Sequence, residues 1–110
     1  MVTHGEPHSA NFMTGDDGSM HLIDWDTVCL GPRERDLWIV AGDDRDALGS
    51  YEAVAGPFKP RPEAMELFDV RWTLADICVY VHWFREPHND SEDDQACWEQ
   101  LTRYLPVDSK

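Results

Sequence analysis

The chain has 110 residues, a formal net charge of -13 and an apolar content of 42%. This length accommodates at most one small domain, and the charge disfavours nucleic acid as a partner because phosphate binding needs clustered Lys and Arg. Mean hydropathy is -0.53. With neither a long apolar run nor a signal-peptide pattern, we expect a cytoplasmic protein that does not span a membrane. Three cysteines without C-x-x-C spacing favour reduced thiols over a disulfide or zinc framework.

The first part of the chain favours short strands and loops. Three strands are expected, at positions 2–3, 12–13 and 20–23. A glycine and a proline make residues 4–11 non-helical, and the Gly-Asp-Asp-Gly sequence at 15–18 predicts a hairpin turn between the second and third strands. Such a hairpin would bring Asn11 and Asp24 to its open end.

Helical patterns dominate the rest of the chain. We expect four helices, at about 33–41, 47–55, 62–85 and 91–105. Pro32 precedes the first, Gly56 and Pro57 end the second, and Ser91 and Pro106 bound the fourth. The third carries two apolar stripes on nearly opposite sides, a pattern that predicts a helix buried by neighbours on both flanks.

Polar residues in the first loop have the spacing of a phosphoryl-transfer site. Four residues separate Glu6 from Asn11, and Asp24 follows thirteen positions later at the end of an expected strand. In a protein-kinase catalytic loop, an acid positions the nucleophile, and an Asn at this spacing and a later Asp hold Mg²⁺. Magnesium prefers oxygen ligands and usually takes only one or two carboxylates from the protein. The pattern therefore predicts Glu6 as the catalytic acid and Asn11 and Asp24 as metal ligands.

The segment from residue 2 to 38 resembles the aminoglycoside phosphotransferase family, whose relatives include choline, methylthioribose and homoserine kinases. The family loop usually reads His-Gly-Asp-x-His-x-x-Asn, so the resemblance places Glu6 where the family has its catalytic Asp. It also implies Mg²⁺ binding at Asn11 and Asp24. The stretches that carry the resemblance are His4-Gly5-Glu6-Pro7-His8-Ser9-Ala10-Asn11, Ile23-Asp24-Trp25-Asp26 and Gly31-Pro32-Arg33-Glu34-Arg35-Asp36-Leu37.

The same resemblance implies supporting residues. His4 and Asp36 match positions that brace the family's catalytic loop, and His8 is interpreted in the same way. From the sequence alone, Asp36 is also an acid that the helix dipole favours in a first turn. Asp69 and Asp76 lie in a polar strip of the third expected helix. They are either a solvated edge or substrate-binding acids, because acids on the C-terminal helices of this family often face the substrate.

These features imply an α+β fold, a fragment of a protein-kinase-like C-terminal lobe with a short β-hairpin, catalytic loops and about four helices. Residues 1–110 are interpreted as one partial phosphotransferase domain, with catalytic and metal loops in 1–38 and a helical subdomain in 39–110. The implied reaction transfers the γ-phosphoryl group of ATP, with Mg²⁺, to a hydroxyl of a small molecule. An aminoglycoside or related cationic antibiotic would suit the acidic chain by steering, while the alternative is that the acidic side chains only solvate the surface, where salt screens them.

In such kinases an N-terminal lobe supplies the phosphate-covering loop and its Lys, and the sequence contains no counterpart. We therefore expect the isolated chain to be inactive, and a missing N-terminal lobe or a second chain to be its partner. Two alternatives stay open. The chain is a truncated or pseudokinase module that binds a metal or a partner, or it is a zinc hydrolase that uses His4 and His8. The second alternative conflicts with Gly5 and Pro7, which disrupt the helix that such a zinc motif needs.

Overall fold

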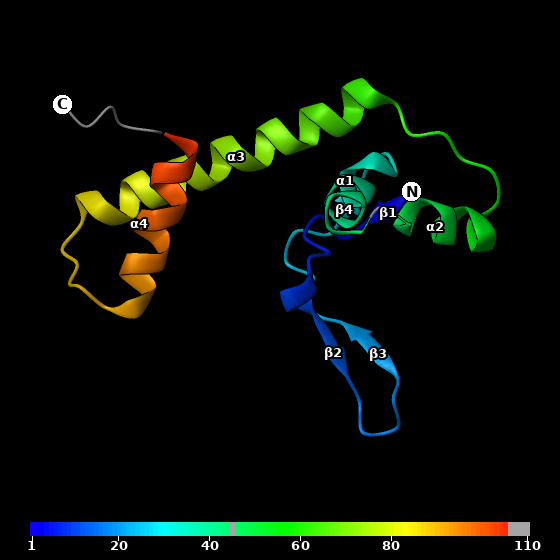
Figure 1. Ribbon diagram of the computed structural model, residues 1–110, viewed down its shortest axis with the longest axis horizontal. Coiled ribbons are helices and arrows are strands. Elements are labelled where there is room, and N and C mark those ends of the chain that lie inside the picture. The colour runs from blue at the N-terminus through cyan, green and yellow to red at the C-terminus, as the bar shows by residue number, and fades with distance from the viewer. Residues whose placement is uncertain (45, 106–110) are drawn as a thin grey trace. The chain divides into compact units, whose positions relative to one another are not determined.

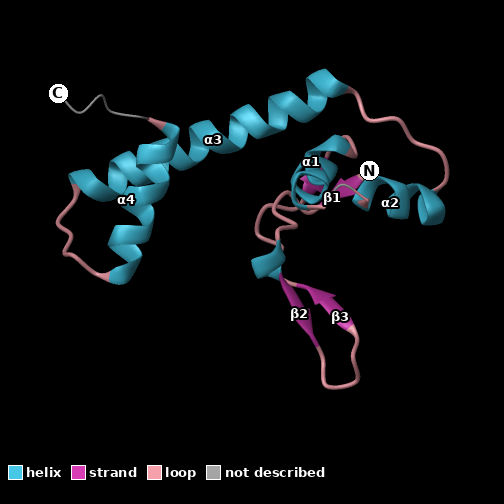
Figure 2. Ribbon diagram, in the orientation of Figure 1, coloured by secondary structure: helices cyan, strands magenta, loops and turns pink. Residues whose placement is uncertain are grey.

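The structure is a computed structural model that describes residues 1–44 and 46–105. The chain forms two compact units, one from Met1 to Asp69 and one that begins at Val70. Strands and helices follow one another as the α+β class predicts, and Figures 1 and 2 show them as labelled ribbons. The elements are β1 (Val2–Thr3), a 3-10 turn (Ser9–Asn11), β2 (Phe12–Thr14), β3 (Met20–Leu22), β4 (Cys29–Leu30), α1 (Glu34–Asp43), α2 (Ala47–Ala55), α3 (Pro62–Arg85) and α4 (Glu92–Tyr104).

Two small antiparallel sheets carry the N-terminal loops. The β2–β3 hairpin, drawn in blue in Figure 1, pairs Phe12 with Leu22, and its turn is closed by the Gly15 N–H donating to the carbonyl of Ser19 at 2.7 Å. This hairpin confirms the prediction for the segment. The second sheet pairs β1 with β4, with Thr3 opposite Cys29. The sequence did not indicate β4, because a strand of two residues has no measurable periodicity.

The expectation that residues 4–11 are non-helical is wrong for Ser9–Asn11, which form one 3-10 turn. The Asn11 N–H donates to the carbonyl of His8 at 2.9 Å. Pro7 precedes this turn, so its missing N–H and ring block a longer α-helix without preventing a single turn after it. The turn buries Asn11, which is 7% exposed.

The four predicted helices are all present. The bounds of α2 and α3 match the prediction, while α1 begins one residue later, at Glu34, and ends two residues later, at Asp43. The hydroxyl of Ser91 accepts the Asp94 N–H at 3.1 Å, so Ser91 caps α4 as expected. Pro106, the predicted end of α4, lies outside the described residues.

The prediction that the third helix is buried on both flanks is wrong for this chain. Of the α3 residues only Ala64 is buried, whereas Leu67, Leu74 and Val79 are 57–61% exposed. In the C-terminal unit α4 packs on one side of α3, where the Tyr104 hydroxyl donates to Asp76 at 2.8 Å. Within the described part of that unit, no second helix covers the opposite side of α3.

Candidate active site

Asp36 in the first turn of α1 holds the start of the loop at residues 4–11 with both carboxylate oxygens. Oδ2 accepts the backbone N–H of His4 at 2.8 Å, and Oδ1 accepts the backbone N–H of Gly5 at 2.7 Å. Hydrogen bonds to an ionised acceptor are stronger than neutral ones. The loop therefore begins at a position fixed relative to α1.

Arg35, the neighbour of Asp36, ties two loop backbones together. Its guanidinium is buried and donates to the Thr3 hydroxyl at 2.8 Å and to the carbonyl of Thr27 at 2.8 Å. It also lies against Gly5, because a Cβ added there would be 2.5 Å from Nη2 of Arg35. Gly5 has a φ of +98°, so both its conformation and its contact with Arg35 favour glycine. Sequence reasoning missed Arg35, whose available signal was only its place beside Asp36.

His4 connects the loop that carries Glu6 with the loop that carries Asp24. Its Nδ1 accepts the N–H of Glu6 at 3.1 Å, and its Nε2 lies 2.8 Å from the carbonyl oxygen of Ile23. Since Nδ1 accepts, the ring proton is on Nε2, which donates to Ile23. The ring is 2% exposed and packs edge-on against Trp25, with centroids 4.7 Å apart. Both ring nitrogens thus serve the fold, which leaves neither for a zinc ion.

Glu6 is carried on a backbone whose two polar atoms are both bonded. Its N–H donates to His4, and its carbonyl accepts from Nδ2 of Asn11 at 2.7 Å. The Glu6 side chain is half-buried. His8 lies near the same amide, with Nε2 3.4 Å from Nδ2 of Asn11. The acid-bearing turn is therefore fixed by contacts within the loop.

Asn11 and Asp24 both lie at the open end of the β2–β3 hairpin. The Ile23 N–H donates to the carbonyl of Asn11 at 2.8 Å, which joins the residues just outside the two strands. Because Nδ2 of Asn11 donates to Glu6, Oδ1 is the atom of this amide suited to a metal ion. Asp24 is exposed and has a φ of +60°, a backbone conformation that non-glycine residues seldom adopt outside functional or turn sites.

The donor set suits magnesium better than zinc. No group of three or more His, Cys, Asp or Glu side chains in the described residues could hold a metal ion. One amide oxygen and one carboxylate, from Asn11 and Asp24, match the few protein ligands that Mg²⁺ takes alongside water. A structural zinc site would need four N or S ligands.

The two acids of the third helix have different surroundings. Asp69 is exposed in the N-terminal unit, and Asp76 is half-buried in the C-terminal unit. Burial and the hydrogen bond to Asp76 raise the pKa of the Tyr104 hydroxyl. Asp76 therefore contributes to the packing of α4 on α3. No helix among the described residues has both the length and the apolar character needed to cross a bilayer.

Residues 1–68 match the phosphotransferase enzyme family (APH), and the chain belongs to this family, as the motifs predict. It is 39% identical over 108 residues to Protein StrN of Streptomyces griseus. This alignment covers 96% of this chain and 29% of StrN. Its fold is similar to the AMP-bound complex of Spectinomycin Phosphotransferase, APH(9)-Ia, with a TM-score of 0.73 at 19% identity. That match covers 96% of this chain and 34% of the other. The chain thus spans about a third of the length of these relatives.

Proposed function

We propose that this chain carries the catalytic and metal loops of an ATP-dependent small-molecule kinase. Glu6 supplies the catalytic carboxylate, which acts as a base, and Asn11 and Asp24 are the magnesium ligands. The observation that carries the proposal is the pair of hydrogen bonds made by His4, one to the Glu6 N–H and one to the Ile23 carbonyl. Through one buried ring, the backbone beside the acid and the backbone beside Asp24 are held together, as catalysis by positioning requires.

Glu6 acts on the substrate hydroxyl. Its carboxylate accepts a hydrogen bond from that hydroxyl and takes its proton as the new O–P bond forms, while the bond between the β-γ bridging oxygen and the γ-phosphorus breaks and ADP leaves. Glu is one methylene longer than the Asp of the usual family loop, and a displacement of about 1 Å can cost on the order of a hundredfold in rate. The hydrogen bonds at both backbone polar atoms of Glu6 fix its main chain, so the displacement is confined to the side chain.

Oδ1 of Asn11 and the carboxylate of Asp24 would hold the Mg²⁺ ion, whose charge when bound offsets that of the ATP phosphates. His8, Asp36 and His4 are positioning residues. His8 orients the Asn11 amide, from which its Nε2 is 3.4 Å distant, and Asp36 fixes the start of the loop. The AMP in the structural relative supports a nucleotide co-substrate, and ATP use implies the cytoplasm.

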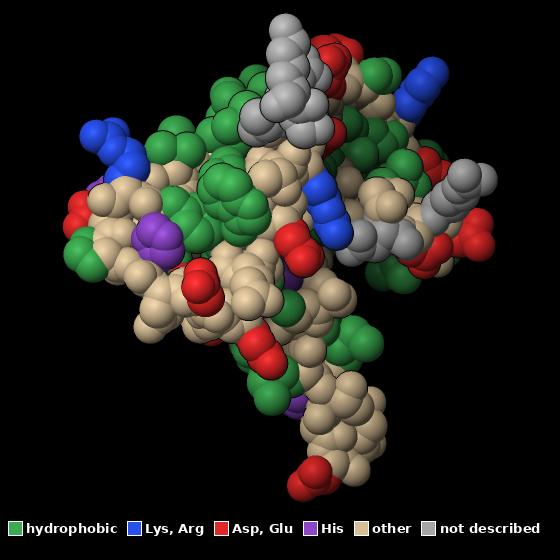
Figure 3. Space-filling model, turned by 60° about the vertical axis from the view of Figure 1, so that its left-hand side comes forward, with side chains coloured by type: hydrophobic (Ala, Val, Ile, Leu, Met, Phe, Trp, Pro, Cys, Tyr) green, Lys and Arg blue, Asp and Glu red, His purple; other side chains and the backbone are tan. Residues whose placement is uncertain are grey.

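The substrate is a small hydroxyl compound, and the name of the structural relative, a spectinomycin phosphotransferase, supports an antibiotic such as spectinomycin. The net charge of -13 suits a cationic substrate, although acidic side chains are dispersed over the face shown in Figure 3 instead of forming one patch. Asp69 and Asp76 are retained as substrate-binding candidates on the helical subdomain 39–110 of this partial domain.

A second candidate is a non-catalytic module that binds a metal or a partner. In either case, the proposed partner is a nucleotide-binding N-terminal lobe or a second chain that provides one. We expect the 110 residues alone to show little turnover, because residues that cover the phosphates have no counterpart in the described fold.

The metal site is tested with Mn²⁺, a paramagnetic substitute for Mg²⁺, by NMR on the 110-residue chain. We expect Mn²⁺ to broaden the side-chain amide signals of Asn11, and Asp24→Asn to abolish the broadening. Asp26→Asn is the matched control, because it removes an exposed carboxylate from the same loop. Equal broadening in both variants would contradict the assignment of Asp24.

The reaction is tested with ATP, Mg²⁺ and a panel of aminoglycosides that includes spectinomycin, using the parent chain and Glu6→Gln, each combined with a nucleotide-binding N-terminal lobe. Turnover that Glu6→Gln lowers by two orders of magnitude or more supports the enzyme. Metal binding without turnover supports the non-catalytic module, and turnover that is unaffected by Glu6→Gln refutes the role of Glu6.

A further inference from the structure

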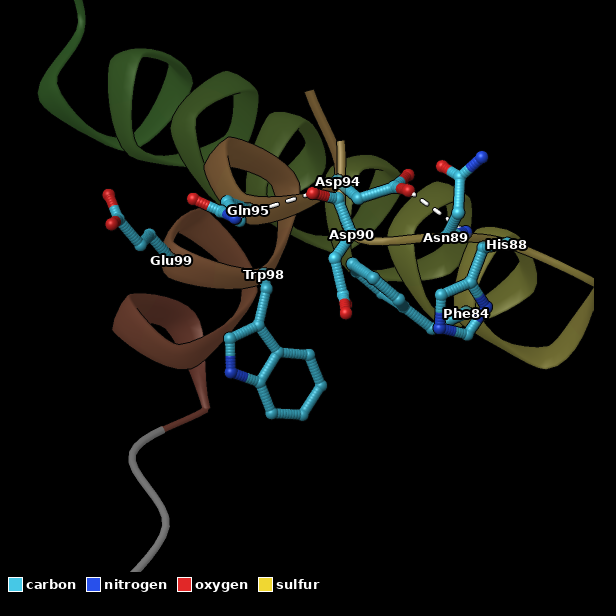
Figure 4. A pocket seen from close by; sticks show the side chains of 8 residues that line it. All are labelled: Phe84, His88, Asn89, Asp90, Asp94, Gln95, Trp98 and Glu99. Atoms are coloured by element: carbon cyan, nitrogen blue, oxygen red, sulfur yellow. Dashed lines mark hydrogen bonds between the residues drawn. The ribbon is translucent and has the colours of Figure 1, made fainter. Parts of the chain in front are cut away.

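The C-terminal unit contains a cavity that the phosphoryl-transfer proposal does not use. It has a volume of about 490 Å³ and lies between the end of α3 and the start of α4, as Figure 4 shows. This volume is in the range of small-molecule sites. The side chains that line it are Phe84, His88, Asn89, Asp90, Asp94, Gln95, Trp98 and Glu99.

Three aromatic rings form one wall of the cavity. Phe84 stands nearly perpendicular to Trp98, with ring centroids 5.3 Å apart, and perpendicular to His88 at 5.1 Å. The indole of Trp98 is 54% exposed, which is unusual for the largest apolar side chain. Perpendicular aromatic rings with an accessible π-face are the arrangement by which proteins bind organic cations.

The charges around the rings are of one sign. None of the eight lining residues is Lys or Arg, and three are carboxylates. Asp94 is buried, and both of its carboxylate oxygens accept hydrogen bonds within the protein, from Trp83 Nε1 at 2.6 Å and from the Asn89 N–H at 3.2 Å. The exposed acids are Asp90 and Glu99, and the Asp90 carboxylate extends to the same side of α4 as the indole of Trp98 in Figure 4.

The carboxylates alone would not single out this place, because the chain has 22 acidic residues. What distinguishes it is a hollow walled by perpendicular rings, with an exposed indole and an adjacent acid. We propose that this cavity binds a small organic ammonium ion, with the Trp98 face and the Asp90 carboxylate as its main contacts. The site lies within the C-terminal unit and does not depend on the phosphoryl-transfer assignment.

The rigidity of the cavity follows from the same contacts. The Asp94 carboxylate accepts hydrogen bonds from Trp83 on α3 and from Asn89 in the loop before α4, so it joins the two segments. The Ser91 hydroxyl accepts the Asp94 N–H and caps α4. The hydrogen bond from Trp83 lowers the pKa of Asp94, so these contacts persist at neutral pH. The cavity wall is thus formed before a ligand arrives, which reduces the cost of binding.

The test uses tetramethylammonium as the probe and NMR titration of the full 110-residue chain at neutral pH. We expect saturable shifts of the Trp98 indole N–H, whereas tert-butanol, an uncharged molecule of similar size, gives none at equal concentration. Trp98→Leu should raise the Kd by on the order of fivefold, the effect of losing one cation–π contact, and Trp98→Phe should restore part of the affinity.

Asp90→Asn and Asp93→Asn form a matched pair. Both remove one exposed carboxylate from the same segment, but only Asp90 lines the cavity, so only Asp90→Asn should weaken binding. Circular dichroism checks that each variant folds, and the Asp90→Asn comparison decides the matter if Trp98→Leu does not fold. Equal effects of the two Asp variants, or shifts of the same size with tert-butanol, would overturn the proposal.

Discussion

Replacing Asp36 separates two physical accounts of this residue. In the first, Asp36 is a first-turn acid stabilised by the helix dipole, worth about 0.3–1 kcal/mol. In the second, it is a brace whose two oxygens accept the N–H groups of His4 and Gly5 at 2.8 and 2.7 Å. Asp36→Glu distinguishes them, because it keeps the charge in the first turn but lengthens the side chain by one methylene.

The expected loss is larger than a dipole effect. A hydrogen bond to a charged group contributes about 1.5–3 kcal/mol, and losing two leaves the backbone donor of His4 unpaired at a residue that is only 2% exposed. We expect Asp36→Glu to lower the free energy of unfolding by about 2–4 kcal/mol after partial relaxation. Asp36→Asn should cost a similar amount, because its amide nitrogen would face one of the two backbone donors.

Chemical denaturation followed by circular dichroism measures the loss, and the His4 and Gly5 amide signals report the loop directly. Glu63→Asp is the control, since it also changes the length of an acid in the first turn of a helix, on α3. If Asp36→Glu is as stable as the parent and the two amide signals do not move, the brace account is refuted and the dipole account stands.

Three further predictions concern the same contacts. Gly5→Ala should lower the free energy of unfolding by about 1–2 kcal/mol because of the positive φ at this position, and further because the added Cβ would contact Arg35. Chemical denaturation measures this loss. Ser91→Ala should lose about 0.5–2 kcal/mol by the same measurement, because its side chain caps α4. Burial acts to raise the pKa of Glu34, but the hydrogen bonds and charge of Arg61 outweigh it, so the folded-state pKa lies below the usual 4.5. That stabilisation is therefore present above pH 4.5 and is lost on acidification below it, and Glu34→Gln should flatten this part of the stability–pH profile.

Local signals in the sequence were sufficient for most of the secondary structure. The Asp-Gly turn, the capping Ser91 and the Gly56-Pro57 pair each act on neighbouring residues, so the hairpin and the helix bounds follow from them. Gly56 indeed ends α2 with a φ of +92°. The strand β4 could not be predicted in this way, because it exists through pairing with β1, a partner about 27 positions away in the chain.

Burial of α3 was predicted from pattern alone, and there the pattern misled. Two apolar stripes indicate which sides of a helix suit an apolar neighbour, but they do not say whether this chain provides that neighbour. Here α4 contacts one side, while Leu67, Val70 and Leu74 stay 48–61% exposed. An exposed apolar stripe of this kind is typical of surfaces that other protein parts cover.

The candidate site likewise has one part that the sequence could predict and one part that it could not. The spacing of Glu6, Asn11 and Asp24 is a property of the sequence, so these positions could be nominated from it. The contacts that hold them could not, because they join residues distant in the chain. His4 reaches the Ile23 carbonyl across 19 positions, and Arg35 reaches the Thr3 hydroxyl across 32.

These long-range contacts also explain why a loop of polar residues can be ordered at all. Its hydrogen bonds to distant residues join a side chain with a backbone group, so each bond fixes the chain path directly. His4 does this twice with one ring, because Nδ1 accepts the Glu6 N–H and Nε2 donates to the Ile23 carbonyl. The path of the loop that carries Glu6, relative to the backbone beside Asp24, thus depends on this one side chain.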